Sequence, residues 1–124
     1  MQLPRPVQSG GAASGGGARY NVVAQATVEP SGALVARVPA RDLGWLARRI
    51  VLQGPPGSIC RLYTGEPGPT SLADGSQAGE LDVADYYQPL YVERSLPLVA
   101  VWSTGTGEPV TGEALLRVEL EEVG

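Results

Sequence analysis

The chain of 124 residues contains no histidine, no phenylalanine and no lysine, so that all nine of its positive charges are arginines. A Ser-His-Asp or Cys-His arrangement needs an imidazole and a Schiff base needs a lysine amine, so these reaction classes are excluded. The absence of histidine, together with a single cysteine, also excludes an ordinary zinc site. We therefore expect no catalytic residue, no cofactor and no metal ligand, and predict that the protein is not an enzyme.

Cysteine and long apolar runs are equally scarce. Cys60 is the single cysteine, so an internal disulfide is impossible, and the alternating apolar run around it predicts a buried thiol. No stretch of about 18 apolar residues is present, and the N-terminus lacks the order of charges and apolar residues typical of a signal peptide. These features predict a soluble protein without a membrane partner, made in a cytoplasm.

The net charge is −4, which argues against a nucleic-acid partner because such domains normally carry a concentrated basic face. The nearest approach to a basic cluster is the set Arg37, Arg41, Arg48 and Arg49. It has two interpretations, a phosphate site or solvated arginines that balance acids on neighbouring strands. The second is favoured, because these residues fall on a predicted strand, a turn and a further strand.

Glycine and proline are abundant, with 17 and 11 residues, and they concentrate at the N-terminus. Residues 1–19 form a predicted arm, in which Pro4 and Pro6 favour an extended path and residues 9–17 have the composition of a flexible linker. The arm is either a disordered tail or a tether that becomes ordered against a neighbouring subunit, and the second interpretation is favoured. Its expected partner-binding residues are Leu3, Pro4, Pro6 and Val7.

Residues 20–124 form a single predicted domain that begins with a hairpin. Residues 21–28 and 33–38 alternate between apolar and other residues, and the Glu-Pro-Ser-Gly turn at residues 29–32 joins them. The expected inward residues are Val22, Ala24, Ala26 and Val28 on the first strand and Leu34, Ala36 and Val38 on the second.

Residues 43–52 fit two patterns. As a helix, the segment would be capped by Asp42 and would bury Leu43, Leu46, Ala47 and Ile50. As a strand, it would place Leu46, Arg48, Ile50 and Leu52 on one side. Gly44 and the many strands expected around it favour the strand.

Four more strands are expected, at residues 59–63, 89–92, 96–102 and 116–121, with a long connection at 64–84 and a loop at 103–112. The continuous apolar run ending at Trp102 predicts a strand buried on both faces. In the last strand Leu116, Val118 and Leu120 should face the core, whereas Arg117, Glu119 and Glu121 should face water. Seven strands and no required helix predict an all-β fold, an antiparallel β-sandwich or jelly roll.

Two groups of residues are candidate binding sites. Glu80, Asp82 and Asp85 lie close in sequence, but they lack the spacing of a calcium loop, and sequence alone does not make them a glycosidase pair, so a solvated loop is expected. The aromatic residues suit either the core and subunit interfaces or a carbohydrate platform, and the first is favoured because phenylalanine is absent. They are Trp45, Tyr63, Tyr86, Tyr87, Tyr91 and Trp102.

A further indication comes from the Cys-Arg-Leu-Tyr run at residues 60–63, the Leu-Ala-Asp-Gly-Ser run at 72–76, the Gln-Pro-Leu run at 88–90 and the strand ending at Trp102. In these features, residues 45–123 resemble small β-sandwich virion proteins of tailed phages of actinobacterial hosts. The resemblance implies a structural role and supplies no catalytic residues. The composition is rich in alanine, glycine, valine and proline and uses arginine for every positive charge, which is also typical of a high-GC genome.

The function expected from the sequence is therefore a structural component of a tailed-phage virion, foremost a capsid decoration protein. Its expected partners are other virion proteins, capsid or tail subunits, and further copies of itself in a homo-oligomer such as a trimer. The alternatives are a neck or tail component of the virion and a carbohydrate- or receptor-binding β-sandwich module. A hydrolase is the least favoured interpretation.

Overall fold

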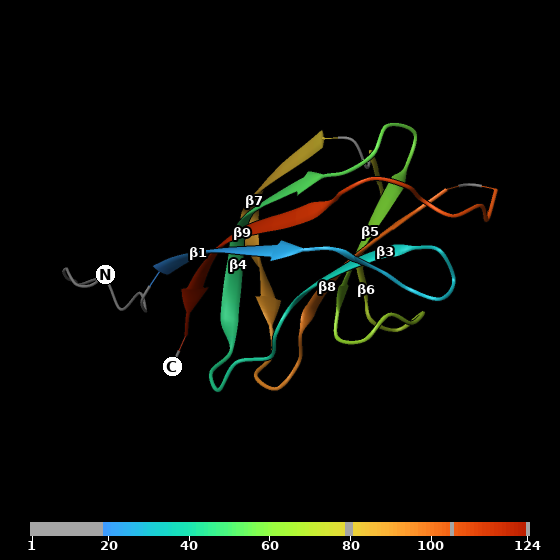
Figure 1. The fold of residues 1–124 in the computed structure, drawn as a ribbon. Helices are drawn as coiled ribbons and strands as arrows, with labels where there is room; N and C mark the ends of the chain where they lie inside the picture. Colours follow the sequence, from blue (N-terminus) through green and yellow to red (C-terminus); the bar gives the residue numbers. More distant parts are fainter. Residues whose placement is uncertain (1–18, 79–80, 105, 124) are drawn as a thin grey trace.

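The computed structural model describes residues 19–78, 81–104 and 106–123, of which residues 74–78 and 81–89 are described by their backbone. Within these ranges the chain forms strands and no helix, and therefore no helix able to cross a membrane (Figure 1). The strands are β1 (Arg19–Gln25), β2 (Thr27–Val28), β3 (Leu34–Val38), β4 (Trp45–Gln53), β5 (Ile59–Thr64), β6 (Leu72–Ala78), β7 (Leu81–Val92), β8 (Leu98–Ser103) and β9 (Leu115–Glu122).

The strands form two antiparallel sheets, a four-stranded sheet of order β1-β9-β4-β7 and a five-stranded sheet of order β2-β3-β8-β5-β6. Apart from the short β2, the first strand pairs with the last, β3 with β8, β4 with β7, and β5 with β6. Pairs nested in this way arise when one long hairpin rolls up so that alternate pairs join different sheets. Leaving aside β2, the strands of the described residues thus form an eight-stranded jelly roll, one of the two architectures predicted from the sequence.

The first segment passes from one sheet to the other. β1 pairs with β9 in the four-stranded sheet, whereas β2 pairs with β3 in the five-stranded sheet, so the predicted hairpin is confined to β2 and β3. Ala26 lies between them and donates its backbone N–H to the carbonyl of Ala114 at 2.9 Å. Val22, Ala24 and Ala26 pack against the core, but Val28 is 66% exposed, so its predicted inward position is wrong. Beyond this crossover, Val28 belongs to a two-residue edge strand that the core does not cover.

Residues 45–53 form a strand, which confirms the favoured interpretation of this segment. The predicted face was partly wrong, because the pairing of β4 with both β7 and β9 shifts between Ala47 and Arg49. This irregularity inserts Arg48 into the strand and reverses the alternation. As a result Trp45 and Ala47 face the core before the shift, whereas Leu46 and Arg48 are only half-buried.

The predicted connection at residues 64–84 is largely strand. β6 pairs with β5, and β7 pairs with β4 beginning at Leu81. The predicted strand at 89–92 is only the end of β7, whose pairing with β4 skips residues 86–89 between its two registers. The sequence did not predict these strands because glycine and proline are disfavoured inside strands. β6 includes Gly75, and the part of β7 that its pairing with β4 skips includes Pro89.

The core lies between the two sheets and contains both tryptophans, Trp45 and Trp102. The inward residues predicted for β9 are confirmed, since Leu116, Val118 and Leu120 are fully buried. Those predicted for the second hairpin strand are buried as well. β8 lies between β3 and β5, and three successive residues at its start are buried, as its continuous apolar run predicted.

Candidate interaction surfaces

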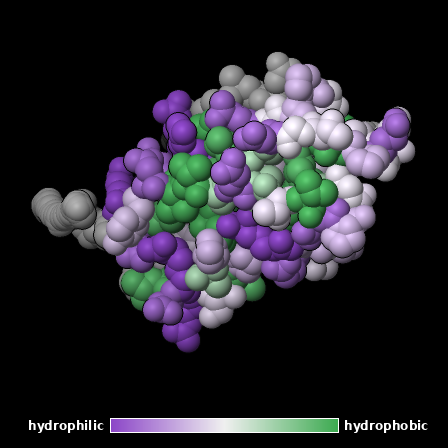
Figure 2. All heavy atoms as spheres, in the orientation of Figure 1, coloured by the Kyte–Doolittle hydropathy of each residue, from purple (hydrophilic) through white to green (hydrophobic). Residues whose placement is uncertain are grey.

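The partner-binding residues predicted in the arm, Leu3, Pro4, Pro6 and Val7, lie outside the described residues. The described part of the chain begins at Arg19 with β1, which is an edge strand of the four-stranded sheet. Interaction sites on the domain therefore have to be sought on the outer faces and edges of the two sheets. On the face turned to the viewer in Figure 1, apolar groups are separated by hydrophilic ones (Figure 2).

The four arginines considered as a phosphate site are divided between the sheets. Arg37 lies on β3, where its guanidinium is 3.1 Å from a carboxylate oxygen of Glu66 and 3.9 Å from one of Glu29. Arg48 and Arg49 lie on β4, in the other sheet. The structure therefore does not bring the four together into one basic patch.

The outer side of the four-stranded sheet carries a buried carboxylate. Glu121, predicted to face water, is only 4% exposed and pairs with Arg48, while Arg19 lies 3.5 Å away. The register explains this position, because Glu121 is opposite Arg19 on one side and next to the irregularity of β4 on the other. Since both arginines lie beside the carboxylate, its negative charge is compensated.

A second ion pair follows at the same end of the sheet. The guanidinium of Arg41 donates to Glu122 at 2.9 Å and lies over the ring of Tyr20, 5.2 Å from its centroid. Tyr91 lies nearby on β7, with its hydroxyl over Gly44, where an added Cβ would come within 2.3 Å of that oxygen. These contacts fix the loop before β4 against the sheet and use the local charges within the chain itself.

The outer face of the five-stranded sheet is different, because apolar residues continue across its strands. One cross-strand row runs from Arg37 on β3 through Val99 and Tyr63 to Leu72 on β6. The neighbouring row contains Val35, Val101 and Arg61. Val99 is fully buried although it is on the outer face, whereas Leu72 at the edge is 48% exposed.

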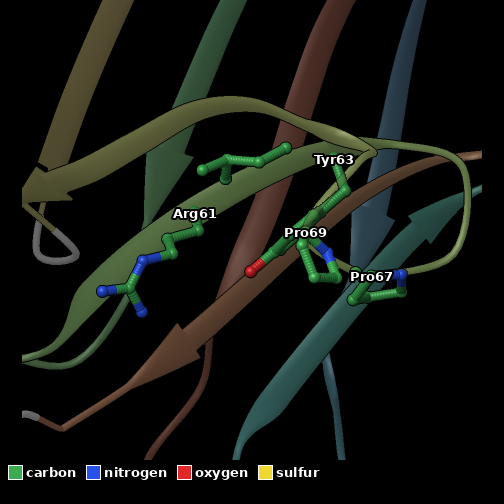
Figure 3. Close-up of a pocket in the computed structure, with 6 residues that line it drawn as sticks. Arg61, Tyr63, Pro67 and Pro69 are labelled. Atoms are coloured by element: carbon green, nitrogen blue, oxygen red, sulfur yellow. The ribbon is translucent and has the colours of Figure 1, made fainter.

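Beside Tyr63 this face forms an open hollow of about 380 Å³. Arg61 and Tyr63 extend into it from β5, and Pro67 and Pro69 belong to the loop that follows (Figure 3). We call it the Tyr63 hollow, and its lining residues are Arg61, Tyr63, Pro67, Gly68, Pro69 and Leu72. Its wall is predominantly apolar, with one guanidinium at the side.

The loop at residues 65–71 is held by its own hydrogen bonds. The Ser71 hydroxyl donates to the carbonyls of Glu66 at 2.7 Å and Gly68 at 3.2 Å. At its start, Gly65 has a φ of +114° and donates its N–H to the carbonyl of Pro97 at 2.8 Å. With two prolines between these anchors, the loop has little conformational freedom to lose when the hollow is occupied.

The other sequence-based candidates do not assemble into a site. Trp45 and Trp102 are in the core, while Tyr63 and Tyr91 lie on different sheets, so the described aromatic side chains form no flat platform. Asp82 and Asp85 belong to β7, not to the expected loop, whereas Glu80 and the side chains of Tyr86 and Tyr87 lie outside the description. Among the described residues, no cluster of three or more acidic or cysteine side chains is placed to hold a metal ion.

Sequence reasoning considered Tyr63 only as one aromatic among six and missed the hollow beside it. The available signal was the Gly-Glu-Pro-Gly-Pro run at residues 65–69, which begins two residues after Tyr63. Two prolines in so short a loop indicate a rigid turn. That this turn folds back beside Leu72 depends on the pairing of β5 with β6, which the sequence pattern did not predict.

No family model and no curated protein matches the sequence. Among solved structures, the chain is similar to a chain in the cryo-EM structure of the extra small virus (XSV) VLP of the giant freshwater prawn Macrobrachium rosenbergii. The sequence identity is 13% and the TM-score 0.40, over 98% of this chain and 86% of that chain. The assignment of a jelly roll rests on the strand pairing within this chain.

Proposed function

We propose that this chain is a non-catalytic structural protein of a virus particle, a tailed-phage virion, in which it decorates the capsid. It would be made in the host cytoplasm and attach to neighbouring subunits through its N-terminal arm and the outer faces of its sheets. The single observation that carries the proposal is the strand order. A jelly roll with nested pairs is an architecture used by viral capsid domains, lectins and cupins.

Since one fold supports several functions, the choice among them depends on the chemistry of the chain. Histidine is the commonest metal ligand, and its absence from the sequence disfavours metal-dependent chemistry. The described aromatic residues form no platform for a sugar, which disfavours the lectin-like function. The sequence resemblance to small virion proteins supports the remaining choice.

The edge strand β1 supports attachment to other subunits. It has seven residues, contains no proline, and exposes Tyr20 and Val23. Proteins that avoid association usually shorten, charge or cover such edges. Here the edge follows directly on the glycine- and proline-rich arm, so one continuous stretch offers a partner both an extended peptide and a strand to pair with.

Two other functions are alternatives to capsid decoration. A neck or tail component would use the same surfaces, because rigid sheets and an extended arm suit any symmetric part of a particle. A carbohydrate- or receptor-binding module is favoured by one observation, the exposed Tyr63 hollow with Arg61 at its side, which has the form of a small ligand site.

The test uses particles that lack this protein. Full-length chain and a variant lacking residues 1–18 are added to them separately, and the particles are sedimented. We expect the full-length chain to sediment with the particles and the truncated chain to remain in the supernatant. Equal co-sedimentation would show that the arm is not the attachment device, and failure of both to sediment would contradict the virion role.

A further inference from the structure

We infer that the Tyr63 hollow is the receptor for residues 3–7 of a second copy of this chain, so that copies are joined arm to hollow. The inference rests on the proposed structural role, and it adds the surface that receives the arm. A head-to-tail contact of this kind joins two different surfaces of the subunit and closes into a ring when the rotation between copies permits.

The chemistry of the two parts is complementary. Residues 3–7 read Leu-Pro-Arg-Pro-Val, in which each residue before a proline is biased towards an extended backbone. Extended proline-rich peptides dock in shallow grooves lined by aromatic side chains, where little entropy is lost because the peptide is already extended. The hollow provides a tyrosine ring from β5, the half-exposed Leu72 from β6, and two prolines in a loop held by its own hydrogen bonds.

Charge favours one placement of the peptide. Arg5 is the only charged side chain in residues 1–18, whereas residues 19–124 carry thirteen acids against eight arginines. Glu66 precedes the lining residue Pro67, is largely exposed, and uses one of its oxygens to pair with Arg37. A peptide placed with Arg5 near Glu66 is therefore attracted to the hollow. A peptide placed with Arg5 near Arg61, in the wall of the hollow, would be repelled.

The direction of the chain favours a second copy over the same molecule. β1 runs from Arg19 towards the crossover at Ala26, where the chain enters the five-stranded sheet. The N-terminal end of β1, at Arg19, is therefore the end farther from the five-stranded sheet. In Figure 1 the start of β1 lies at the left and the loop between β5 and β6 at the lower right. Residues 8–18, which lie between the docking segment and β1, span up to about 40 Å when extended, which is enough to reach a neighbour.

The test measures self-association of the full chain by sedimentation velocity over a concentration series. Leu72→Asp places a charge at the mouth of the hollow, and Val28→Asp places the same charge on another exposed apolar residue of the same sheet. A Pro4→Ser/Pro6→Ser double variant alters the arm and leaves the hollow intact. We expect Leu72→Asp and the double variant each to weaken association about tenfold to a hundredfold, and Val28→Asp to have no comparable effect.

A mixing experiment provides the second part of the test. Leu72→Asp keeps an intact arm and the double variant keeps an intact hollow, so a mixture of the two should form dimers that neither forms alone. The inference is overturned if the wild-type chain stays monomeric, if Leu72→Asp and Val28→Asp behave alike, or if the mixture contains no dimer. Loss of particle binding on deletion of residues 1–18 would still support the proposed function in each of those cases.

Discussion

Gly32 joins the turn between β2 and β3 to the loop that precedes β9, and replacing it by alanine should weaken the whole domain. Its φ is +91°, its N–H donates to the carbonyl of Glu29 at 2.8 Å, and its carbonyl accepts from Val110 at 2.9 Å. An added Cβ would lie 2.9 Å from the Cα of Pro109, which is backbone and cannot rotate away. Gly32→Ala therefore combines backbone strain with a steric clash.

Gly57 separates the two effects, because its φ is +82° and an added Cβ there meets nothing within 4 Å. Alanine in this conformation costs about 1–2 kcal/mol, and the reduced entropy of the unfolded chain offsets about 0.4–1 kcal/mol of it. We expect Gly57→Ala to lower the free energy of unfolding by about 1 kcal/mol. Crowding against Pro109 adds about 1–3 kcal/mol, so Gly32→Ala should lower it by about 2–4 kcal/mol.

The assay is guanidinium unfolding at equilibrium, followed by fluorescence of the buried Trp45 and Trp102. The midpoints give the change in unfolding free energy when the slopes agree with that of the wild type. Equal losses for the two alanine variants would refute the reasoning, because they would mean that the contact of Gly32 with Pro109 has no energetic consequence.

Three further predictions concern the core and the arm. Leu116→Ala or Leu120→Ala should lower the unfolding free energy by about 2–5 kcal/mol, and exposed Arg117→Ala by less than about 1 kcal/mol; equal losses in denaturant titrations would mean that the faces of β9 are misassigned. The thiol of Cys60 is buried, so it should react slowly with a thiol reagent in the native protein and quickly in denaturant, and rapid native labelling would contradict its burial. Removal of residues 1–18 should leave the thermal unfolding midpoint nearly unchanged in a calorimetric scan, whereas a large decrease would show that the arm stabilises its own domain.

Sequence patterns predicted the fold class because the clearest strands alternate regularly between core and solvent. In β9 the residues from Leu116 to Leu120 alternate with a period of two, and the inward leucines and valine are all buried. β8 was recognisable for a different reason, since its apolar run matches a central strand between β3 and β5. These local signals were sufficient for an antiparallel two-layer fold.

Departures from the regular period account for what the sequence did not predict. The irregularity at Arg48 reverses the alternation in β4, and no residue type there indicates it in advance. Glu121 looked like an exposed residue because its burial depends on Arg48 and Arg19, which are distant in sequence. The Tyr63 hollow likewise exists only because β5 and β6 pair and fold their proline-rich loop back beside Leu72.

The proposed virion role requires the chain to be a stoichiometric part of a virus particle. The deciding measurement is quantitative mass spectrometry of gradient-purified particles, produced from the genome that encodes this chain, with the major capsid protein as the internal reference. We predict that the chain stays with the particles through the gradient at a fixed ratio to the capsid protein, set by the particle's symmetry. Its absence from the particles, or a ratio that falls with each round of purification, would contradict the structural role.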